Sequence, residues 1–308
     1  MGDGTEQNPY TREDVLRLIE ENSGTANGLD LSEKWFEESC SLYAIELQGI
    51  ILQRAHLKEA NFNHSHLERA YLLNARLENA CLENTHLEKA NLEIAHLEEA
   101  FMGGAHLENA NLDMAHLEGT YLVDAHLEGA YLWRAKLSPE TRLEQANWGN
   151  FILGEEISER FDRAANTYRQ LKQWYTNAGI YDTAGKFFFR EMTANRKATK
   201  WWPNPLNRCF SKLVSILCGY GEKPERVVVS AVVLILGLAI AFHLWGSFDT
   251  SSFGDKLYYS AVSFTAVGYG NWAPEPTGWA KGMGVAEAFL GVFMMALFLV
   301  TFTKKMTR

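Results

Sequence analysis

The sequence predicts a multidomain membrane protein in which a repetitive solenoid, a helical linker and an all-α part with two membrane spans follow one another. Three observations support this. An apolar residue recurs every five positions from Leu42 to Leu137, two long apolar stretches lie near the carboxyl end, and a short glycine-containing segment separates them. We therefore expect four regions: an amino-terminal cap (1–39), the solenoid (40–137), the linker (138–224) and the membrane part (225–308).

The solenoid is predicted from its period of five residues. Twenty repeat centres, most of them Leu, run from Leu42 to Leu137, and most have Ala two positions before them. This period fits neither an α-helix, with about 3.6 residues per turn, nor a strand, with a period of about 2. It fits a coil of square cross-section with one pentapeptide on each side. The pattern resembles the pentapeptide-repeat family, and this resemblance implies a right-handed quadrilateral β-helix.

Stacked coils would arrange the outer side chains in columns. Column A contains His66, His86, His106 and His126 beside Glu68, Glu88, Glu108 and Glu128. Column B contains His56, Arg76, His96, His116 and Lys136 beside Glu78, Glu98 and Glu118. The plainest interpretation is a solvated surface of compensating charges. A pH sensor is the alternative, because free imidazoles charge below a pKa of about 6.5. Metal binding is disfavoured, because a column lacks the closed tetrahedral geometry of zinc sites.

The other two faces carry large apolar side chains. Tyr71, Tyr131 and Trp133 fall on one face, and Phe101 and Tyr121 on the other. Aromatic residues grouped on a surface indicate a contact. We expect either neighbouring subunits or the chain's own terminal segments to cover them.

The linker is expected to be helical. Apolar residues recur at helical spacing from Glu155 to Ala178, and a second helix is predicted from Tyr181 to about Lys200. Residues 204–218 are amphipathic and precede a span, which favours a helix along the inner membrane surface. The Gly-Tyr-Gly triplet at 219–221 is interpreted as a hinge.

The membrane part contains two candidate spans, at 225–247 and 279–302. Each is long enough to cross a hydrocarbon core of about 30 Å. Residues 254–264, between the spans, are too few to cross and suit a re-entrant pore helix. We therefore expect the pore helix and the segment after it to occupy 254–271.

Residues 265–271 read Thr-Ala-Val-Gly-Tyr-Gly-Asn. With its flanking spans, this segment resembles the Thr-Val-Gly-Tyr-Gly selectivity filter in the pore module of two-transmembrane potassium channels. The resemblance implies a homotetramer in which K⁺ is bound by rings of backbone carbonyls. The implied filter residues are Thr265, Ala266, Val267, Gly268, Tyr269 and Gly270, with the carbonyls of Ala266, Val267, Gly268 and Tyr269 as the K⁺ ligands.

Three residues depart from the family pattern. Ala266 stands where the family usually has a second Thr, Asn271 replaces the usual Asp, and Tyr258 replaces the usual Trp. The resemblance assigns filter support to the positions of Tyr258 and Asn271, so these changes question the selectivity for K⁺ over Na⁺. A weakly selective channel for monovalent cations is the alternative.

Two further features of the second span suggest roles in the channel. Glu287 is a carboxylate well inside the span, and we expect it to support the filter or, as the alternative, to act in ion permeation. Gly291 falls near the hinge glycine of the family's inner helix. Met295, Leu299 and Phe302 follow at helical spacing, as a hydrophobic constriction or as simple packing residues.

The charge distribution predicts the orientation. Nine basic residues lie between Lys186 and Arg226, whereas the segment joining the spans has one, Lys256. By the positive-inside rule, we expect both termini in the cytoplasm. The protein is expected in the plasma or inner membrane. No apolar stretch near Met1 resembles a signal peptide, so the solenoid is expected to stay in the cytosol.

The sequence thus predicts a tetrameric potassium-selective channel whose repeat domain serves regulation or assembly. A membrane-tethered scaffold is the alternative from another class. The solenoid is acidic, with thirteen Asp and Glu against seven Lys and Arg between Arg54 and Lys136, in a chain of net charge −9. Some acidic pentapeptide-repeat rods resemble DNA, but here the basic residues adjoin the membrane, so lipid rather than nucleic acid is the expected partner. No nucleophile motif, phosphate-binding loop or cofactor motif is present, so we expect neither an enzyme nor a cofactor other than K⁺ in the filter.

Overall fold

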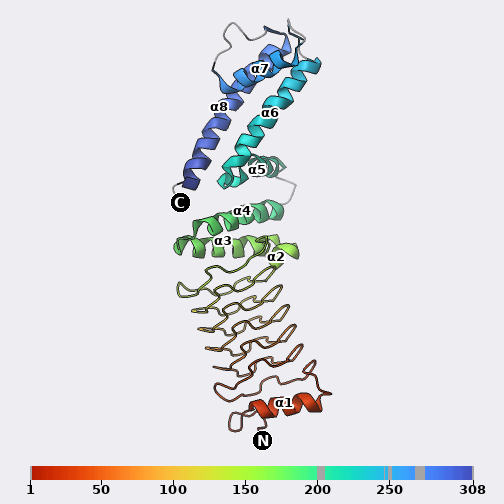
Figure 1. Cartoon of the computed structure of the whole chain (residues 1–308), viewed down its shortest axis with the longest axis vertical. Coiled ribbons are helices and arrows are strands. Elements are labelled where there is room, and N and C mark those ends of the chain that lie inside the picture. Colours follow the sequence, from red (N-terminus) through yellow and green to blue (C-terminus); the bar gives the residue numbers. More distant parts are fainter. Residues whose placement is uncertain (1, 200–204, 246, 249–251, 268–274, 307–308) are drawn as a thin grey trace. The chain divides into compact units, whose positions relative to one another are not determined.

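The computed structural model describes residues 2–199, 205–245, 247–248, 252–267 and 275–306 (Figure 1). The chain divides into two compact units, Met1–Ala198 and Thr199–Arg308. The helices of the first unit are α1 (Arg12–Glu21), α2 (Gly154–Ile157), α3 (Phe161–Asn177) and α4 (Tyr181–Ala198). The second unit contains α5 (Pro205–Cys218), the 3₁₀ helix η1 (Gly219–Gly221), α6 (Pro224–Trp245), β1 (Ser247–Phe248), α7 (Phe253–Thr265), β2 (Pro276–Thr277) and α8 (Trp279–Met306).

The first unit is a β-coil held by isolated parallel bridges rather than by long strands. Between Ser41 and Lys136 the bridged residues are 20 positions apart, as in His66 with His86. One turn of the coil therefore takes four five-residue repeats. Each repeat adds backbone hydrogen bonds to its neighbours, such as Leu67 N to the His86 carbonyl at 2.7 Å.

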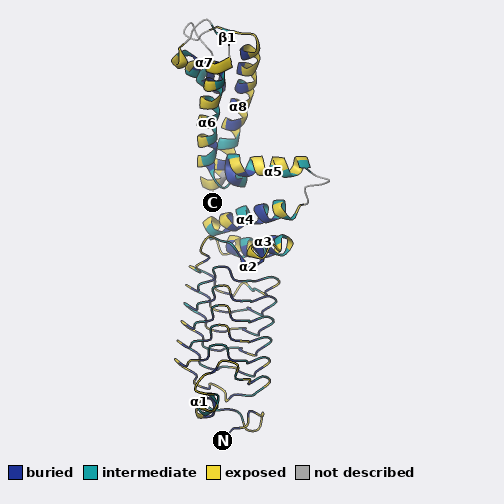
Figure 2. Cartoon of the chain, turned by 90° about the vertical axis from the view of Figure 1, so that its right-hand side faces the viewer, coloured by how far each residue is buried: buried dark blue, intermediate teal, exposed yellow. Residues whose placement is uncertain are grey.

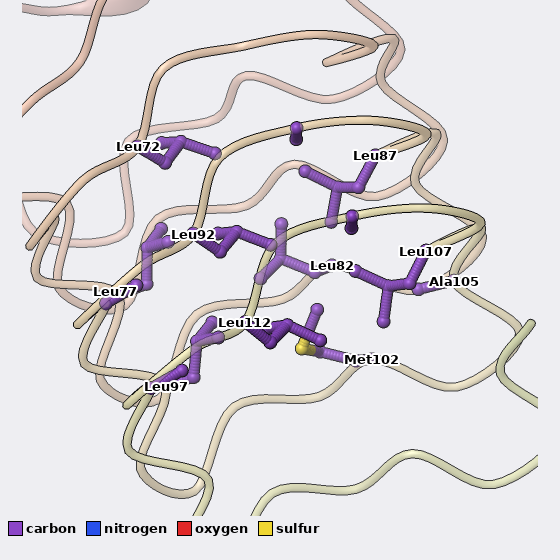
Figure 3. Packing of buried hydrophobic residues seen from close by; sticks show 14 of the residues in the cluster. Leu72, Leu77, Leu82, Leu87, Leu92, Leu97, Met102, Ala105, Leu107 and Leu112 are labelled. Atoms are coloured by element: carbon purple, nitrogen blue, oxygen red, sulfur yellow. The ribbon is translucent and has the colours of Figure 1, made fainter. Parts of the chain in front are cut away.

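The repeat centres point into the coil and form its core. Figure 3 shows Leu72, Leu92 and Leu112 in successive turns, and each is at most 1% exposed. Burying a leucine stabilises a fold by about 1.5–3 kcal/mol. Where Thr replaces the small Ala, its hydroxyl donates to a carbonyl of the preceding turn, as in Thr85 to Phe62 at 2.8 Å. This burial of the centres agrees with a coil that has one pentapeptide on each side.

The coil extends beyond the predicted range of 40–137. A parallel bridge already joins Tyr10 with Phe36, and the regular pairs run from Asp30 with Ile51 to His126 with Asn147. In the Asp30 and His126 pairs the separation is 21 positions instead of 20. One extra residue near each end therefore breaks the strict period of five while the coil itself continues.

Helices α2, α3 and α4 complete the carboxyl end of the first unit. A single helix from Glu155 to Ala178 was predicted, and this prediction is wrong, because the chain leaves the helix between α2 and α3. Glu159 there has φ 59°, in the left-handed region that interrupts a helix. Helices α3 and α4 pack through Tyr168, Tyr175 and Phe187, each at most 2% exposed.

Glu155 closes the last turn of the coil. Its carboxylate accepts from the Leu132 backbone N–H and from the Thr167 hydroxyl, both at 3.0 Å. The neighbouring Gly154 N–H donates to the Ala130 carbonyl at 3.0 Å. Glu155 is fully buried, and this burial raises the pKa of its carboxyl group. Its side chain thus occupies the place where another turn of the coil would supply a carbonyl.

Some of the outer aromatic residues are covered by the chain itself. The Tyr131 hydroxyl lies 2.7 Å from the Ser158 hydroxyl, and the Arg163 guanidinium lies 4.1 Å from the centre of the Trp133 ring. Tyr71 and Phe101 remain 49% and 48% exposed. The terminal segments therefore account for one part of these faces only.

In the described part of the second unit, the regular elements are helices and the two-residue strands β1 and β2, which pair antiparallel. Helices α6 and α8 are long and apolar enough to cross a membrane, with 17% and 22% of their most apolar windows buried. Figure 2 shows exposed residues along these helices and along α5. In α5, Leu206 and Phe210 are 82% and 67% exposed, which fits the predicted amphipathic helix.

Candidate functional site

Helix α7 ends where the predicted filter begins. Thr265 is its last residue, and its hydroxyl donates to the Ala261 carbonyl at 2.9 Å. Ala266 follows with φ 53° and ψ 25°, a left-handed conformation that turns the chain out of the helix. Val267 is 81% exposed. The other predicted filter and support residues there, Gly268, Tyr269, Gly270 and Asn271, lie outside the described residues.

Glu287 contacts helix α7, the predicted pore helix, through Ser260. The Ser260 hydroxyl on α7 donates to the Glu287 carboxyl on α8 at 2.5 Å and lies 3.0 Å from the Ile235 carbonyl on α6. Ser260 and Glu287 are 0% and 1% exposed. One hydroxyl therefore lies within hydrogen-bond distance of polar groups on both flanking helices.

The second carboxyl oxygen of Glu287 has no hydrogen-bond partner among the described residues, although it is buried. Buried polar atoms in folded proteins almost always have a partner. We therefore expect a donor for this oxygen from outside the described residues of this chain, such as a water molecule or another copy of the chain.

Two glycines of α8 allow α7 to approach closely. A Cβ atom at Gly291 would lie 1.8 Å from the Phe264 carbonyl oxygen, and one at Gly284 would lie 2.1 Å from the Tyr259 hydroxyl. A side chain at Gly291 would clash with backbone and force the helices apart, whereas one at Gly284 would displace the Tyr259 ring. Gly291 therefore has a packing reason to be glycine, beside the predicted hinge.

The importance of Ser260 and Gly284 was not recognised from the sequence. A signal was present, because Gly284, Glu287 and Gly291 are separated by three and four positions and share one face of a helix. A face of two glycines and one acid in an otherwise apolar span indicates a close contact with a polar partner.

The predicted support residue Tyr258 does not pack inside the chain. It is 42% exposed, whereas the adjacent Tyr259 is 2% exposed and lies against Phe242 with ring centroids 5.4 Å apart. Within one chain, Tyr259 rather than Tyr258 therefore packs α7 against α6. The role of Tyr258 and Asn271 in filter support remains a prediction.

The predicted constriction residues lie on the exposed surface of α8. Met295, Leu299 and Phe302 are 46%, 62% and 44% exposed, whereas the neighbouring Met294 is 2% exposed and packs within the unit. Packing inside one chain thus does not explain these three side chains. They face lipid, another copy or a pore.

Comparisons with known proteins agree with this geometry. Residues 228–308 match the family described as ion channel, and residues 50–88 and 87–122 match pentapeptide repeats, in eight copies. The chain therefore carries an ion channel domain of the two-transmembrane kind at its carboxyl end and pentapeptide repeats in its amino-terminal half. No curated protein matches the chain.

Solved pentapeptide-repeat proteins are similar to the first unit. Rfr23 from the cyanobacterium Cyanothece 51142 is 24% identical, over 44% of this chain and 99% of that protein, with a TM-score of 0.35. HetL from the cyanobacterium Nostoc sp. PCC 7120, involved in heterocyst differentiation regulation, is 28% identical, over 43% of this chain and 56% of that protein, with a TM-score of 0.28. The alr5209 protein from Nostoc PCC 7120 is 25% identical, over 46% of this chain and 90% of that protein, with a TM-score of 0.18.

Proposed function

We propose that the protein is a potassium-selective ion channel formed by four copies of the chain in a plasma or inner membrane. One observation carries this proposal. A 13-residue helix, too short to span, lies between two long apolar helices and ends at Thr265, where the filter-like segment begins. Short helices between two spans bring non-helical backbone into a membrane only where protein or water surrounds it.

In this proposal the backbone carbonyls of Ala266, Val267, Gly268 and Tyr269 bind dehydrated K⁺, with Thr265 and Gly270 at the two ends of the filter. Four chains supply rings of carbonyl dipoles that replace the hydration shell of the ion. Ala266 lacks the hydroxyl that would complete the innermost site. The other carbonyl rings do not depend on that hydroxyl, so the selectivity for K⁺ is retained.

Glu287 supports the filter from behind in this proposal. Its contact with Ser260 fixes α7, which carries the filter, to α8 at 2.5 Å. A carboxylate buried in a span is costly unless its oxygens have partners. The burial of Glu287 supports a positioning role. A carboxylate in the ion pathway would be expected to be exposed.

Gly291 acts as the hinge of α8. Met295, Leu299 and Phe302 form the constriction that closes by excluding water.

Both termini lie in the cytoplasm. The coil, with bridges from Asp30 to Asn147, is a right-handed quadrilateral β-helix, and the membrane part is 225–308. The repeat domain regulates the pore or aids its assembly. Monovalent cations and membrane lipid are the partners, with neither nucleic acid nor a cofactor beyond K⁺.

Reversal potentials test the proposal. Purified full-length protein is reconstituted into liposomes with K⁺ on one side and Na⁺ on the other, and current is recorded. We expect a reversal potential close to that of K⁺. Equal permeability for the two ions would instead support a weakly selective cation channel, the second candidate, which the substitutions at Ala266 and Asn271 favour. Absence of any ion flux would leave a membrane-tethered scaffold.

A further inference from the structure

One face of the coil has almost no charge at its outward positions. In each repeat the residues before and after the buried centre lie on the outside, as Phe101 and Gly103 do on either side of the completely buried Met102. Parallel bridges stack four such repeats into a surface that we call the aromatic face (residues 61–63, 81–83, 101–103 and 121–123). Of its eight outward residues only Glu83 is charged, whereas every repeat of column A carries a glutamate. A second acidic coil can therefore approach this face with little repulsion.

The middle of the aromatic face is an exposed apolar surface. Phe101 and Tyr121 bridge each other in successive turns and are 48% and 36% exposed. A Cβ atom at Gly103 would lie 3.2 Å from Cε1 of the Tyr121 ring, so this ring lies against bare backbone. Aromatic side chains grouped in this way on a surface indicate a contact with another molecule.

The carboxyl-terminal end of the aromatic face carries one charge of each sign. Arg142 bridges Tyr121 in the next turn, and Glu144 follows two positions later, on the other side of the buried Leu143. The Arg142 guanidinium donates to the Glu144 carboxylate at 2.8 Å, and the two side chains are 53% and 35% exposed. Both ions can therefore reach a neighbouring molecule while they stay paired with each other.

The opposite face of the coil, which contains Tyr71, is less available to a partner. Its carboxyl-terminal end is covered by the chain itself, through the contacts of Tyr131 with Ser158 and of Trp133 with Arg163. The aromatic face is thus the apolar face that another coil can approach over several turns.

Two copies of the aromatic face are complementary when their coils run parallel. A two-fold axis along the stack reverses the strand direction, so the residue before each centre meets the residue after it in the other copy. Phe101 of one copy then faces Gly103 of the other, beside the Tyr121 ring. In the next turn Tyr121 faces Val123. In the turn after that, Arg142 of one copy faces Glu144 of the other, and the symmetry forms this pairing of opposite charges twice.

We propose that the aromatic face binds the same face of a second copy of the chain, so that the repeat domains associate as parallel pairs. Copies inserted into one membrane have the same orientation, which favours the parallel arrangement. A cationic partner would instead be attracted to the glutamates of columns A and B. In the proposed tetramer, the four coils would form two such pairs.

Cross-linking of the full-length chain in detergent tests this contact. Cys81 lies on the aromatic face and is partly exposed, whereas Cys40 and Cys218 are buried, and the exposed Cys209 is replaced by serine. A bismaleimide with a short spacer should link two copies through Cys81, since facing sheets lie about 10 Å apart. The additional substitution Cys81→Ser should abolish the covalent dimer on a denaturing gel.

A matched pair of charges tests which face is used. Phe101→Glu places an unpaired carboxylate in the contact and should lower the yield of the dimer linked through Cys81 at least about fivefold. Tyr71→Glu, at a residue of equal exposure on the opposite face, should leave this yield unchanged. Both positions are half-exposed, so neither substitution should change the thermal unfolding of the coil.

A cysteine in another turn tests the parallel arrangement. In the chain that lacks Cys81 and Cys209, Asn63→Cys should restore the covalent dimer, because parallel coils bring equal turns together. An antiparallel pair centred on Phe101 would separate the two substituted positions by four turns, about 19 Å, and would leave them unlinked. Tyr71→Cys in the same chain serves as the control for random collision and should give no dimer.

Three results would overturn the proposal: no dimer through Cys81, equal effects of Phe101→Glu and Tyr71→Glu, or a dimer through Tyr71→Cys but not through Asn63→Cys. The cross-link involves no ion conduction. Its outcome is therefore distinguishable from a failure of the proposed channel activity, which the reversal potentials measure.

Discussion

The two units of the chain differ in where their apolar side chains lie. In the coil, Leu92 is completely buried by other residues of the same chain. In the second unit, Val267 and Phe289 are 81% and 77% exposed, and much of the surface of α6 and α8 is apolar. A soluble monomer rarely leaves such surfaces in contact with water. The coil is thus complete within one chain, whereas the second unit requires a bilayer and, in our proposal, three more copies.

The most disruptive test of this comparison is truncation. Deleting residues 1–150 would remove Trp148, whose indole donates to the Tyr175 hydroxyl at 2.7 Å, and Leu132, the partner of Glu155. Helices α3 and α4 would lose the surface they cover, and we expect aggregation in size-exclusion chromatography. Deleting residues 1–198 follows the boundary between the units. This shorter chain should form a conducting tetramer with a changed open probability in single-channel recordings.

The same truncation tests the role of the repeat domain. If it regulates the pore, the response of the current to mild acidification should also be lost in the chain that lacks residues 1–198. An unchanged open probability and an unchanged pH response would assign the domain to assembly or localisation.

Two matched leucine substitutions, one in each unit, should differ in how much they lower the free energy of unfolding. Leu92→Ala leaves a cavity in the coil and should lower its free energy of unfolding by about 2–5 kcal/mol. Leu244→Ala, at a residue of α6 that is 60% exposed, should change that free energy by less than about 0.5 kcal/mol. Thermal unfolding of both variants in detergent checks this. Similar losses would mean that the two units do not differ as described.

Substitutions at Glu287 test whether the second unit also has an interior of its own. Glu287→Gln keeps an acceptor for Ser260, whereas Glu287→Ala removes it and leaves a void. We expect Ala to reduce tetramer stability, or the persistence of current, far more than Gln does, with a loss of about 1–3 kcal/mol. Equal and negligible effects of the two substitutions would show that Glu287 contributes to packing only.

Ser260→Ala and Ser263→Ala provide the control on the other side of this contact. The Ser263 hydroxyl is also buried, but it donates to the Tyr259 carbonyl within α7 at 2.8 Å. Only Ser260→Ala should reproduce the effect of Glu287→Ala.

The smallest effect is expected at the filter. Ala266→Thr restores the hydroxyl of the innermost site, and we expect it to increase block by Ba²⁺ more than it changes the ratio of K⁺ to Na⁺ permeability. Current recordings with both ions, before and after addition of Ba²⁺, distinguish the two quantities. A large change in the permeability ratio would show that this hydroxyl, rather than the carbonyl rings, controls selectivity.

The coil could be predicted almost completely from the sequence because each inward leucine is repeated at a fixed spacing. Its ends could not, because a single extra residue between Trp35 and Ser41, and another between Lys136 and Arg142, interrupts the period without interrupting the bridges. The break before α3 was missed for a similar reason, since a left-handed Glu159 has no marker such as glycine or proline.

The candidate site was predicted unevenly. Glu287 could be singled out because a charge inside an apolar span is visible in the sequence, whereas the filter segment stays a prediction made from a short motif. Ser260 could not be singled out, because its contact joins residues 27 positions apart and depends on how α7 crosses α8. Gly284 and Gly291 determine this crossing, and only the structure shows what a side chain there would meet.

The closure of the last turn by Glu155 has a consequence for assembly. Each turn of a β-coil is a template for the next, and an uncovered end offers unpaired backbone donors and acceptors to any other chain, as the edge of an amyloid sheet does. Here the Leu132 N–H is already bonded to a carboxylate, and α2 and α3 follow directly. The Glu155 side chain thus occupies the backbone donor that an incoming strand would need. Rods of this kind therefore resist end-to-end polymerisation into fibres, which matters for a protein that would bring four of them together at one membrane site.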